Sequence, residues 1–159
     1  MKYILAHDLG TTGNKATLFS AAGELIASSF KGYETYYSGS DRVEQDPEDW
    51  WNSFRKATRD IINKSNVNPN NIIALSISGQ MMSVVPVDGS GTLLRKAMIW
   101  ADSRSFRQVD LVKSLLKKED IYSITGSRIS PNHQGPKIAW IKKNEPVIYK
   151  KTHKFLQAK

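Results

Sequence analysis

Short apolar runs separated by glycine-containing turns open the chain. Residues 3–9, 15–20 and 24–30 each have the length and apolar content of a β-strand. Turn-forming residues fill 10–14 and 22–23 between them. The pattern therefore predicts three short strands joined by tight turns into an antiparallel meander.

A helix is predicted after a polar stretch at 35–45, which we interpret as a loop. Asp46 suits the N-cap, Pro47 the first helical position, and the acidic residues that follow favour the positive end of the helix dipole. Apolar side chains then recur at helical spacing at Trp50, Phe54, Ala57 and Ile61. This helix is expected to pack on the sheet, with its aromatic residues in the core rather than against a ligand.

A nearly continuous apolar run at 72–78 predicts a buried strand that ends at Gly79 and Gln80. In open α/β sheets, ligands bind beyond the carboxyl ends of such strands. Two further strands are predicted at 84–87 and 93–100, and Pro86 favours an edge position for the first of them.

The rest of the chain is predicted to be mainly helical. Asp102 or Ser103 can cap a helix whose apolar stripe is Phe106, Val109, Val112, Leu115 and Leu116. Beyond it we expect a loop at 131–135, short helices at 136–143 and 146–150, and an extended segment at 153–156. The whole pattern indicates an α/β fold with a mixed sheet.

Composition narrows the class of protein. The 159 residues include no cysteine, so disulfides, thiolate nucleophiles and cysteine-based metal sites are excluded. No secretory signal is recognisable and no run reaches the roughly 20 apolar residues that span a bilayer, so a cytoplasmic location without a membrane partner is expected.

The net charge of +8 is unevenly distributed. Residues 1–80 carry 8 basic and 9 acidic side chains, whereas residues 81–159 carry 15 and 6. The basic residues occur singly or in pairs without repeated aromatic neighbours, which favours solvated helix faces over a nucleic-acid surface. We therefore expect no nucleic-acid partner.

The first turn carries the most informative candidate chemistry. Glycines allow a ligand close to the backbone, while threonine hydroxyls, backbone amides and a lysine can bind phosphate oxygens. The candidate phosphate-binding residues are Gly10, Thr11, Thr12, Gly13, Asn14 and Lys15. Asp8, at the end of the first strand, suits a magnesium ion held against the same phosphates. The turn is not a Walker A loop, and taken alone it is more typical of an ordinary hairpin than of a phosphate site.

Three further motifs accompany this turn, at 44–51, 78–82 and 100–104. Together with residues 8–15, they make the chain similar to the FGGY carbohydrate kinases, in particular to the xylulokinase-like members. The resemblance implies an actin-like ATPase (ribonuclease H-like) domain with an antiparallel meander and flanking helices. It also implies ATP-dependent phosphorylation of a ketose such as xylulose or of a related polyol, with ATP and a magnesium ion as cofactors.

The resemblance places sugar contacts in two segments, Gln80, Met81 and Met82, and Trp100, Asp102 and Arg104. An amide can bond sugar hydroxyls, an indole can stack on a sugar ring, and a carboxylate and guanidinium can accept and donate hydrogen bonds. Met82 stands where the xylulokinase-like motif has a histidine, which puts xylulose itself in doubt. The alternatives are methionines that fill the core, and a buried tryptophan beside an N-capping Asp102.

The resemblance also implies that residues 1–159 form an incomplete N-terminal kinase domain. No aspartate here matches the general base of the family, which is expected beyond residue 159, so this chain holds no catalytic residue and is expected to be inactive alone. Its partners would be a sugar substrate and the missing C-terminal kinase domain. A homodimer is left open. The alternative function is a non-catalytic sugar-binding or interaction fragment.

Overall fold

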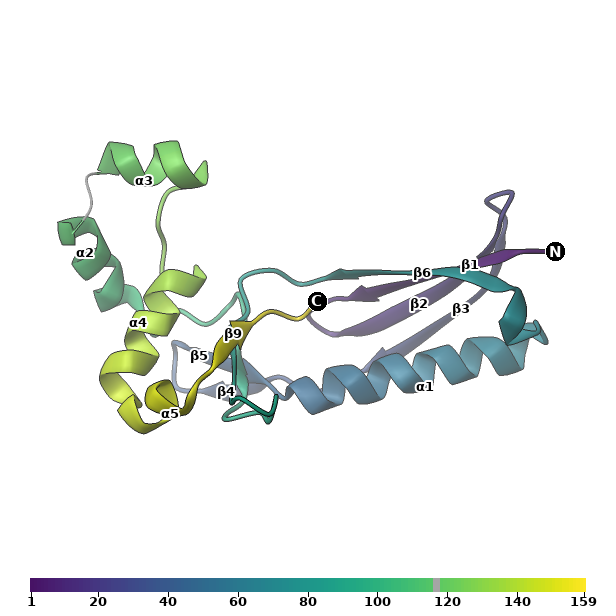
Figure 1. Cartoon of the computed structure of the whole chain (residues 1–159), viewed down its shortest axis with the longest axis horizontal. Coiled ribbons are helices and arrows are strands. Elements are labelled where there is room, and N and C mark those ends of the chain that lie inside the picture. Colours follow the sequence, from purple (N-terminus) through teal and green to yellow (C-terminus); the bar gives the residue numbers. More distant parts are fainter. Residues whose placement is uncertain (116–117) are drawn as a thin grey trace. The chain divides into compact units, whose positions relative to one another are not determined.

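The computed structural model describes residues 1–115 and 118–159 (Figure 1). It divides into two compact units, which we describe separately. Unit 1 comprises Met1–Thr35, Asp46–Gln80 and Ala158–Lys159, and unit 2 comprises Tyr36–Gln45 and Met81–Gln157.

Unit 1 is built on a four-stranded sheet with the order β3-β2-β1-β6. Its strands are β1 (Tyr3–Leu9), β2 (Gly13–Ser20), β3 (Leu25–Gly32) and β6 (Ile72–Gly79). The first three pair antiparallel and β6 pairs parallel to β1, which confirms the predicted meander within a mixed sheet. A short 3-10 turn, η1 (Pro69–Asn71), leads into β6.

Helix α1 (Pro47–Ser65) runs alongside the strands of unit 1 in Figure 1. The side chain of Asp46 accepts a hydrogen bond from the Glu48 amide, as predicted for an N-cap. The buried core between helix and sheet consists of Leu5, Ala16, Leu18, Ala57 and Ile61. The alternation of apolar and polar residues on β1 and β2 directs these side chains to one face, against the apolar stripe of α1.

Strand β6 differs from its prediction, because its apolar side chains are not buried. Ile73, Leu75 and Ile77 are 56%, 50% and 38% exposed. The register pairs Leu75 with Leu5 and Ile77 with His7. Because parallel partners point to the same face, Leu75 and Ile77 lie on the face of the sheet that α1 covers. Helix α1 packs mainly on β2 and β3, however, so within the described residues it leaves these side chains of β6 uncovered. An apolar run therefore predicted the strand correctly and its burial wrongly.

Unit 2 contains two small sheets. One has the order β4-β5-β8, from β4 (Tyr36–Ser38), β5 (Arg42–Gln45) and β8 (Ala97–Met98), and the other pairs β7 (Val85–Val87) with β9 (Lys154–Leu156). The prediction of a loop at 35–45 was wrong, because β4 and β5 form a hairpin whose second strand is anchored by β8. The strand predicted at 93–100 is reduced to β8 and an isolated bridge between Leu93 and Val87.

The helices of unit 2 are α2 (Phe106–Leu115), α3 (Lys118–Thr125), α4 (Gln134–Asn144) and α5 (Pro146–Lys151). Helix α2 begins later than predicted, and α3 was not predicted. Phe106 and Leu115 are exposed although they were assigned to the apolar stripe, whereas Val109 is buried. Leu116, the last residue of that stripe, lies outside the described residues. A buried cluster of Val84, Met98 and Ile141 connects the strands to α4.

Candidate functional site

The end of β1 in unit 1 presents an acidic and a basic side chain on one face of the sheet. Asp8 and Lys15 are register partners across β1 and β2, and Ser78 of β6 is the partner of Asp8 on its other side. Both Asp8 and Lys15 are exposed. Because partners across a sheet share a face, the predicted metal residue and phosphate-binding lysine lie side by side.

The turn between β1 and β2 is tight and braced from β3. The Gly10 amide donates to the Gly13 carbonyl over 3.0 Å, and the Tyr33 hydroxyl donates to the Gly10 carbonyl. Burial raises the pKa of Tyr33 to about 12, and the Asp8 carboxylate adds to the effect. Tyr33 is therefore a neutral donor that fixes the turn. Thr12 at the tip is exposed, and Thr11 is half-buried.

The two glycines of this turn have different surroundings. A Cβ on Gly13 would lie 2.7 Å from the Lys31 carbonyl and would also overlap the Phe30 ring. A Cβ on Gly10 would meet nothing nearer than the Gly13 carbonyl at 3.5 Å. Gly13 is thus required by the close approach of β3, while Gly10 leaves its backbone accessible to a ligand.

Asn14 and Lys15 belong to β2 rather than to the turn, so the predicted phosphate-binding segment ends in a strand. Asn14 is fully buried, and its amide nitrogen lies 3.0 Å from Nδ1 of His7. Nε2 of His7 lies 3.2 Å from the Thr58 hydroxyl, which donates to the Phe54 carbonyl. We assign His7 as the neutral Nε2–H tautomer on this network.

The environment of His7 is apolar as well as hydrogen-bonded. Its ring stacks on Phe54 with centroids 3.9 Å apart. Burial lowers the pKa of His7, and the hydrogen bond that a protonated Nδ1 would donate to the Asn14 side-chain oxygen, 3.3 Å away, opposes that effect only in part. The side chain of Asn14 is therefore directed to the interior, and any contact of this residue with phosphate would be made by its backbone.

Among the described residues, no three or more acidic, histidine or cysteine side chains form a group that could hold a metal ion. Magnesium, however, usually keeps several waters and binds proteins through one or two carboxylates together with substrate phosphates. The exposed Asp8 carboxylate next to a glycine turn fits that requirement. Asp8 would hold the ion, which would supply charge neutralisation on the phosphates.

Of the predicted sugar-contact residues, Gln80 belongs to unit 1 and the others to unit 2. The backbone N–H of Gln80 donates to the Leu9 carbonyl over 2.8 Å, which continues the β1–β6 pairing to the end of the sheet. In unit 2, Met81 is 68% exposed and Trp100 is 46% exposed. These exposures contradict the alternatives of a core-filling Met81 and a buried Trp100. Met82 has a φ of 63° in the left-handed region, a conformation that costs a non-glycine residue free energy.

Asp102 and Arg104 form a closed ion pair in the interior of unit 2. Asp102 is fully buried, and Oδ2 accepts hydrogen bonds from Arg104 Nη2 over 2.7 Å and from the Val43 amide over 2.8 Å. Arg104 Nε lies 3.0 Å from both carboxylate oxygens. Burial lowers the pKa of Arg104, but the carboxylates of Asp102 and Glu44 outweigh it and the net pKa is raised.

These contacts correct the alternative role of Asp102. Helix α2 begins at Phe106, so neither Asp102 nor Ser103 lies at its N-cap, and the Asp102 carboxylate instead ties β5 to the segment before α2. Arg104 and the Val43 amide occupy positions at which this carboxylate accepts hydrogen bonds. Asp102, which was predicted to contact the sugar, thus forms its hydrogen bonds within the protein.

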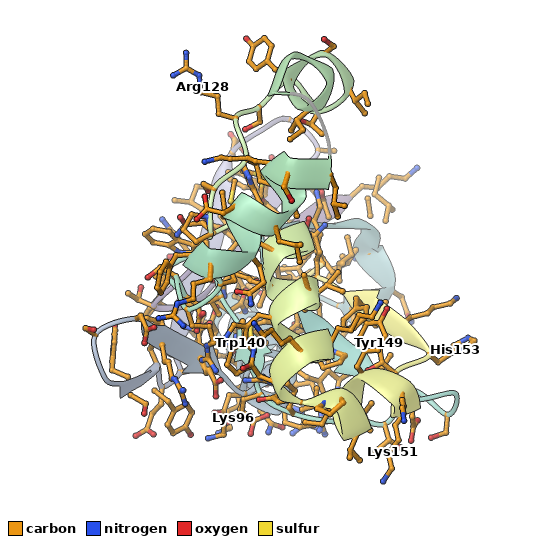
Figure 2. All side chains as sticks on the ribbon, turned by 90° about the vertical axis from the view of Figure 1, so that its left-hand side faces the viewer. Lys96, Arg128, Trp140, Tyr149, Lys151 and His153 are labelled. Atoms are coloured by element: carbon orange, nitrogen blue, oxygen red, sulfur yellow. The ribbon has the colours of Figure 1, made fainter. Side chains whose placement is uncertain are left out.

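The ion pair extends into a larger network that the sequence did not indicate. Glu44 accepts from Arg104 Nη2 over 2.6 Å and from Arg95, whose Nη1 donates to Glu145 over 2.6 Å. The guanidinium of Arg104 also lies 5.1 Å from the ring centroid of Trp140, a residue of α4 that is labelled in Figure 2. These groups are held together by long-range contacts between segments far apart in sequence.

Lys137 on α4 is a second residue that the sequence reasoning passed over. It is fully buried, and its Nζ donates to the Ile99 carbonyl over 2.7 Å and to the Met82 carbonyl over 3.0 Å. The available signal was its position one helical turn before Ile141, on the inner face of a short helix. Burial lowers the pKa of Lys137 to about 8; the Asp102 carboxylate opposes this effect, and Arg104 adds to it.

Comparison with known proteins identifies the class to which this fold and these motifs belong. Residues 3–159 match the N-terminal domain of the FGGY family of carbohydrate kinases. A xylulose kinase of Bacillus subtilis is 34% identical over 160 residues, covering 100% of this chain and 32% of that protein. A glycerol kinase of Acaryochloris marina is 31% identical, covering 87% of this chain and 28% of that protein.

A solved structure supports the same relationship. The crystal structure of a xyloylose kinase from Brucella ovis superposes with a TM-score of 0.93 at 27% identity, covering 99% of this chain and 32% of that one. The chain therefore belongs to the FGGY family of carbohydrate kinases, and the predicted mixed α/β kinase fold is confirmed. It spans about a third of the length of the relatives it matches. No helix within the described residues has the length and apolar character needed to cross a membrane.

Proposed function

We propose that the full-length protein transfers a phosphoryl group from ATP to a hydroxyl of a small sugar or polyol. In this proposal residues 1–159 supply part of the phosphate site and part of the sugar site. The observation that carries it is the adjacent, exposed pair of Asp8 and Lys15 at a glycine turn, in a chain that matches a carbohydrate kinase family over residues 3–159.

The roles within unit 1 follow from the chemistry of phosphoryl transfer, which depends on positioning and on charge stabilisation. Gly10 leaves room for a phosphate at the backbone, and the hydroxyls and amides of residues 11–13 supply donors. Lys15 adds a positive charge, and Asp8 would hold magnesium. The braced turn needs little rearrangement on binding, which lowers the cost of ordering it.

The sugar contacts proposed in unit 2 centre on exposed side chains. Met81 and Trp100 provide apolar surface for the carbon face of a sugar, and Gln80 in unit 1 remains a proposed hydroxyl partner. Asp102 and Arg104 would act chiefly by shaping the segment that carries Trp100, since their polar atoms already bond each other. Met82 in place of histidine favours a ketose or polyol other than xylulose.

We further propose that this chain is part of an incomplete N-terminal domain and that the general base lies outside residues 1–159. A base must reach the substrate hydroxyl in a form able to accept its proton. Asp102 is unsuited to that task because it is fully buried and already accepts hydrogen bonds from Arg104 and Val43.

The test is turnover by the full-length protein with ATP and magnesium on a panel that includes xylulose, glycerol and other ketoses and polyols. Formation of a sugar phosphate, dependent on magnesium, is expected. Residues 1–159 alone are expected to give none, with at most weak sugar binding by calorimetry. The alternative of a non-catalytic sugar-binding or interaction protein is favoured if the full-length protein binds a sugar but leaves ATP unconsumed.

A further inference from the structure

Lys137 is a buried cation whose hydrogen-bond partners are main-chain carbonyls from two separate segments. Its Nζ donates over 3.0 Å to Met82 and over 2.7 Å to Ile99, and none of the side chain is exposed. The first carbonyl belongs to one proposed sugar-contact segment, and the second directly precedes Trp100, which begins the other. A single ammonium group thus holds both segments of unit 2 at once.

Packing alone does not explain a lysine at this position. Lysine is almost never fully buried, because removing an ammonium group from water costs much more than burying an apolar side chain of similar length. A methionine could fill the same volume without that cost. What methionine lacks is the set of N–H donors that bond the two carbonyls.

The surrounding charges make the buried ammonium tolerable. Three cations and three carboxylates lie in this region: Lys137, Arg104 and Arg95, with Asp102, Glu44 and Glu145. The two arginines form ion pairs with all three carboxylates. Lys137 and Arg95 are comparable members of this network because each is a largely enclosed cation. They differ in their partners, since Arg95 bonds two carboxylates and the Lys96 carbonyl, and neither proposed sugar segment.

The conformation of both segments depends on these bonds. Met82 adopts a left-handed conformation, which a non-glycine residue keeps only when its surroundings impose it. The Trp100 carbonyl is itself held by the side-chain amide of Asn132, over 2.6 Å, just before α4. Lys137 near the start of α4 and Asn132 just before it therefore bond the backbone next to the exposed Met81 and at the exposed Trp100.

We propose that Lys137 is a positioning residue for sugar binding, which sets the backbone of residues 81–82 and that of residues 99–100 relative to each other. The inference rests on the proposed kinase function and on the sugar contacts assigned there. Small displacements of groups that orient a substrate can change its binding and turnover by large factors, so loss of the two bonds should weaken sugar recognition specifically.

The experiment compares Lys137→Met with Arg95→Met in the full-length protein. We expect Lys137→Met to raise the sugar KM by about tenfold or more while the ATP KM stays within about twofold. Arg95→Met, which also removes an enclosed cation, should lower the melting temperature but leave the sugar KM within about twofold. Lys137→Gln, which keeps N–H donors on a shorter side chain, should give an intermediate sugar KM.

Three outcomes would overturn the inference. The first is an unchanged sugar KM in a folded Lys137→Met protein. The second is an equal rise of the sugar KM in Lys137→Met and in Arg95→Met. The third is that Lys137→Met and Lys137→Gln both fail to fold while Arg95→Met folds. The last result would make Lys137 a folding determinant only. Failure of the proposed function is distinguishable, because the unmodified full-length protein would then phosphorylate no member of the panel.

Discussion

The guanidinium of Arg104 closes back on the carboxylate of Asp102, two residues before it, with Nε 3.0 Å from both oxygens and Nη2 2.7 Å from Oδ2. The pair is buried and is tied to β5 through Glu44 and the Val43 amide. The pair thus joins β5 to the segment before α2 without a bound ligand. The segment 100–104 therefore combines an exposed ring at Trp100 with an internal ion pair.

Asp102→Ala is accordingly expected to destabilise the fold. Removing one partner of a buried ion pair leaves the other charge uncompensated, which costs about 3–5 kcal/mol. Urea unfolding followed by circular dichroism measures the loss, and Asp110→Ala, at an exposed carboxylate on α2, is the matched control with an expected change within about 0.5 kcal/mol. Unchanged stability with a weaker sugar KM would instead assign Asp102 to direct sugar contact.

The local features of the fold were predictable from sequence because they depend on neighbouring residues. The meander follows from strand-length apolar runs and glycine turns, and the start of α1 follows from Asp46 and Pro47. The burial of β6 was not predictable in the same way. An apolar run shows that a strand can be buried, whereas the position of α1 over β2 and β3 decides which strand is covered.

The candidate site shows the same division. Asp8 and Lys15 could be placed together from the strand–turn–strand pattern, since a tight turn makes them register partners. The contact of Lys137 with Met82 and Ile99 joins residues 55 and 38 positions apart in sequence. No local pattern specifies contacts of that range, and a lysine in a basic half of the chain resembles a solvated one. Its inner-face helical position was a sequence signal for its burial.

His7 gives unit 1 a pH-dependent stability. Burial lowers its pKa, so the unfolded chain binds the proton more readily than the folded one. The stabilisation is present above the unfolded pKa of about 6.5 and is lost as the pH falls toward the lower folded pKa. We expect the free energy of unfolding to fall by up to about 1.4 kcal/mol per pH unit across that window on account of His7.

The measurement is urea unfolding between about pH 7.5 and about pH 5.5 for the parent protein and for His7→Gln, which cannot take up a proton in this range. His7→Gln should show a shallower pH dependence. His153→Gln, at an exposed histidine, serves as the control and should keep the parent slope. Identical slopes for the parent and His7→Gln would contradict the assignment of a buried neutral imidazole.

Gly13 and Gly10 should respond differently to alanine. Gly13→Ala puts a methyl group against the Lys31 carbonyl and the Phe30 ring, and overpacking of this kind costs about 1–3 kcal/mol. Gly10→Ala has space for the methyl group and should leave stability within about 0.5 kcal/mol. Because a side chain there obstructs close approach to the backbone, Gly10→Ala should raise the ATP KM. Equal destabilisation by the two substitutions would show that the turn has no accessible backbone.

Asp8 should matter for turnover and little for stability, because it is exposed at the end of β1. Asp8→Asn keeps the shape of the side chain and removes the charge that would hold magnesium against the phosphates. In the full-length protein we expect a loss of well over tenfold in kcat/KM, partly relieved by higher magnesium, with an unfolding free energy within about 0.5 kcal/mol of the parent.

Asp110→Asn, which removes an exposed carboxylate elsewhere, should leave turnover unchanged. A change in turnover of less than about threefold corresponds to under roughly 1 kcal/mol in the barrier and would exclude Asp8 from the phosphate site. A large loss that accompanied equal destabilisation would instead place its role in the folding of the β1–β2 turn.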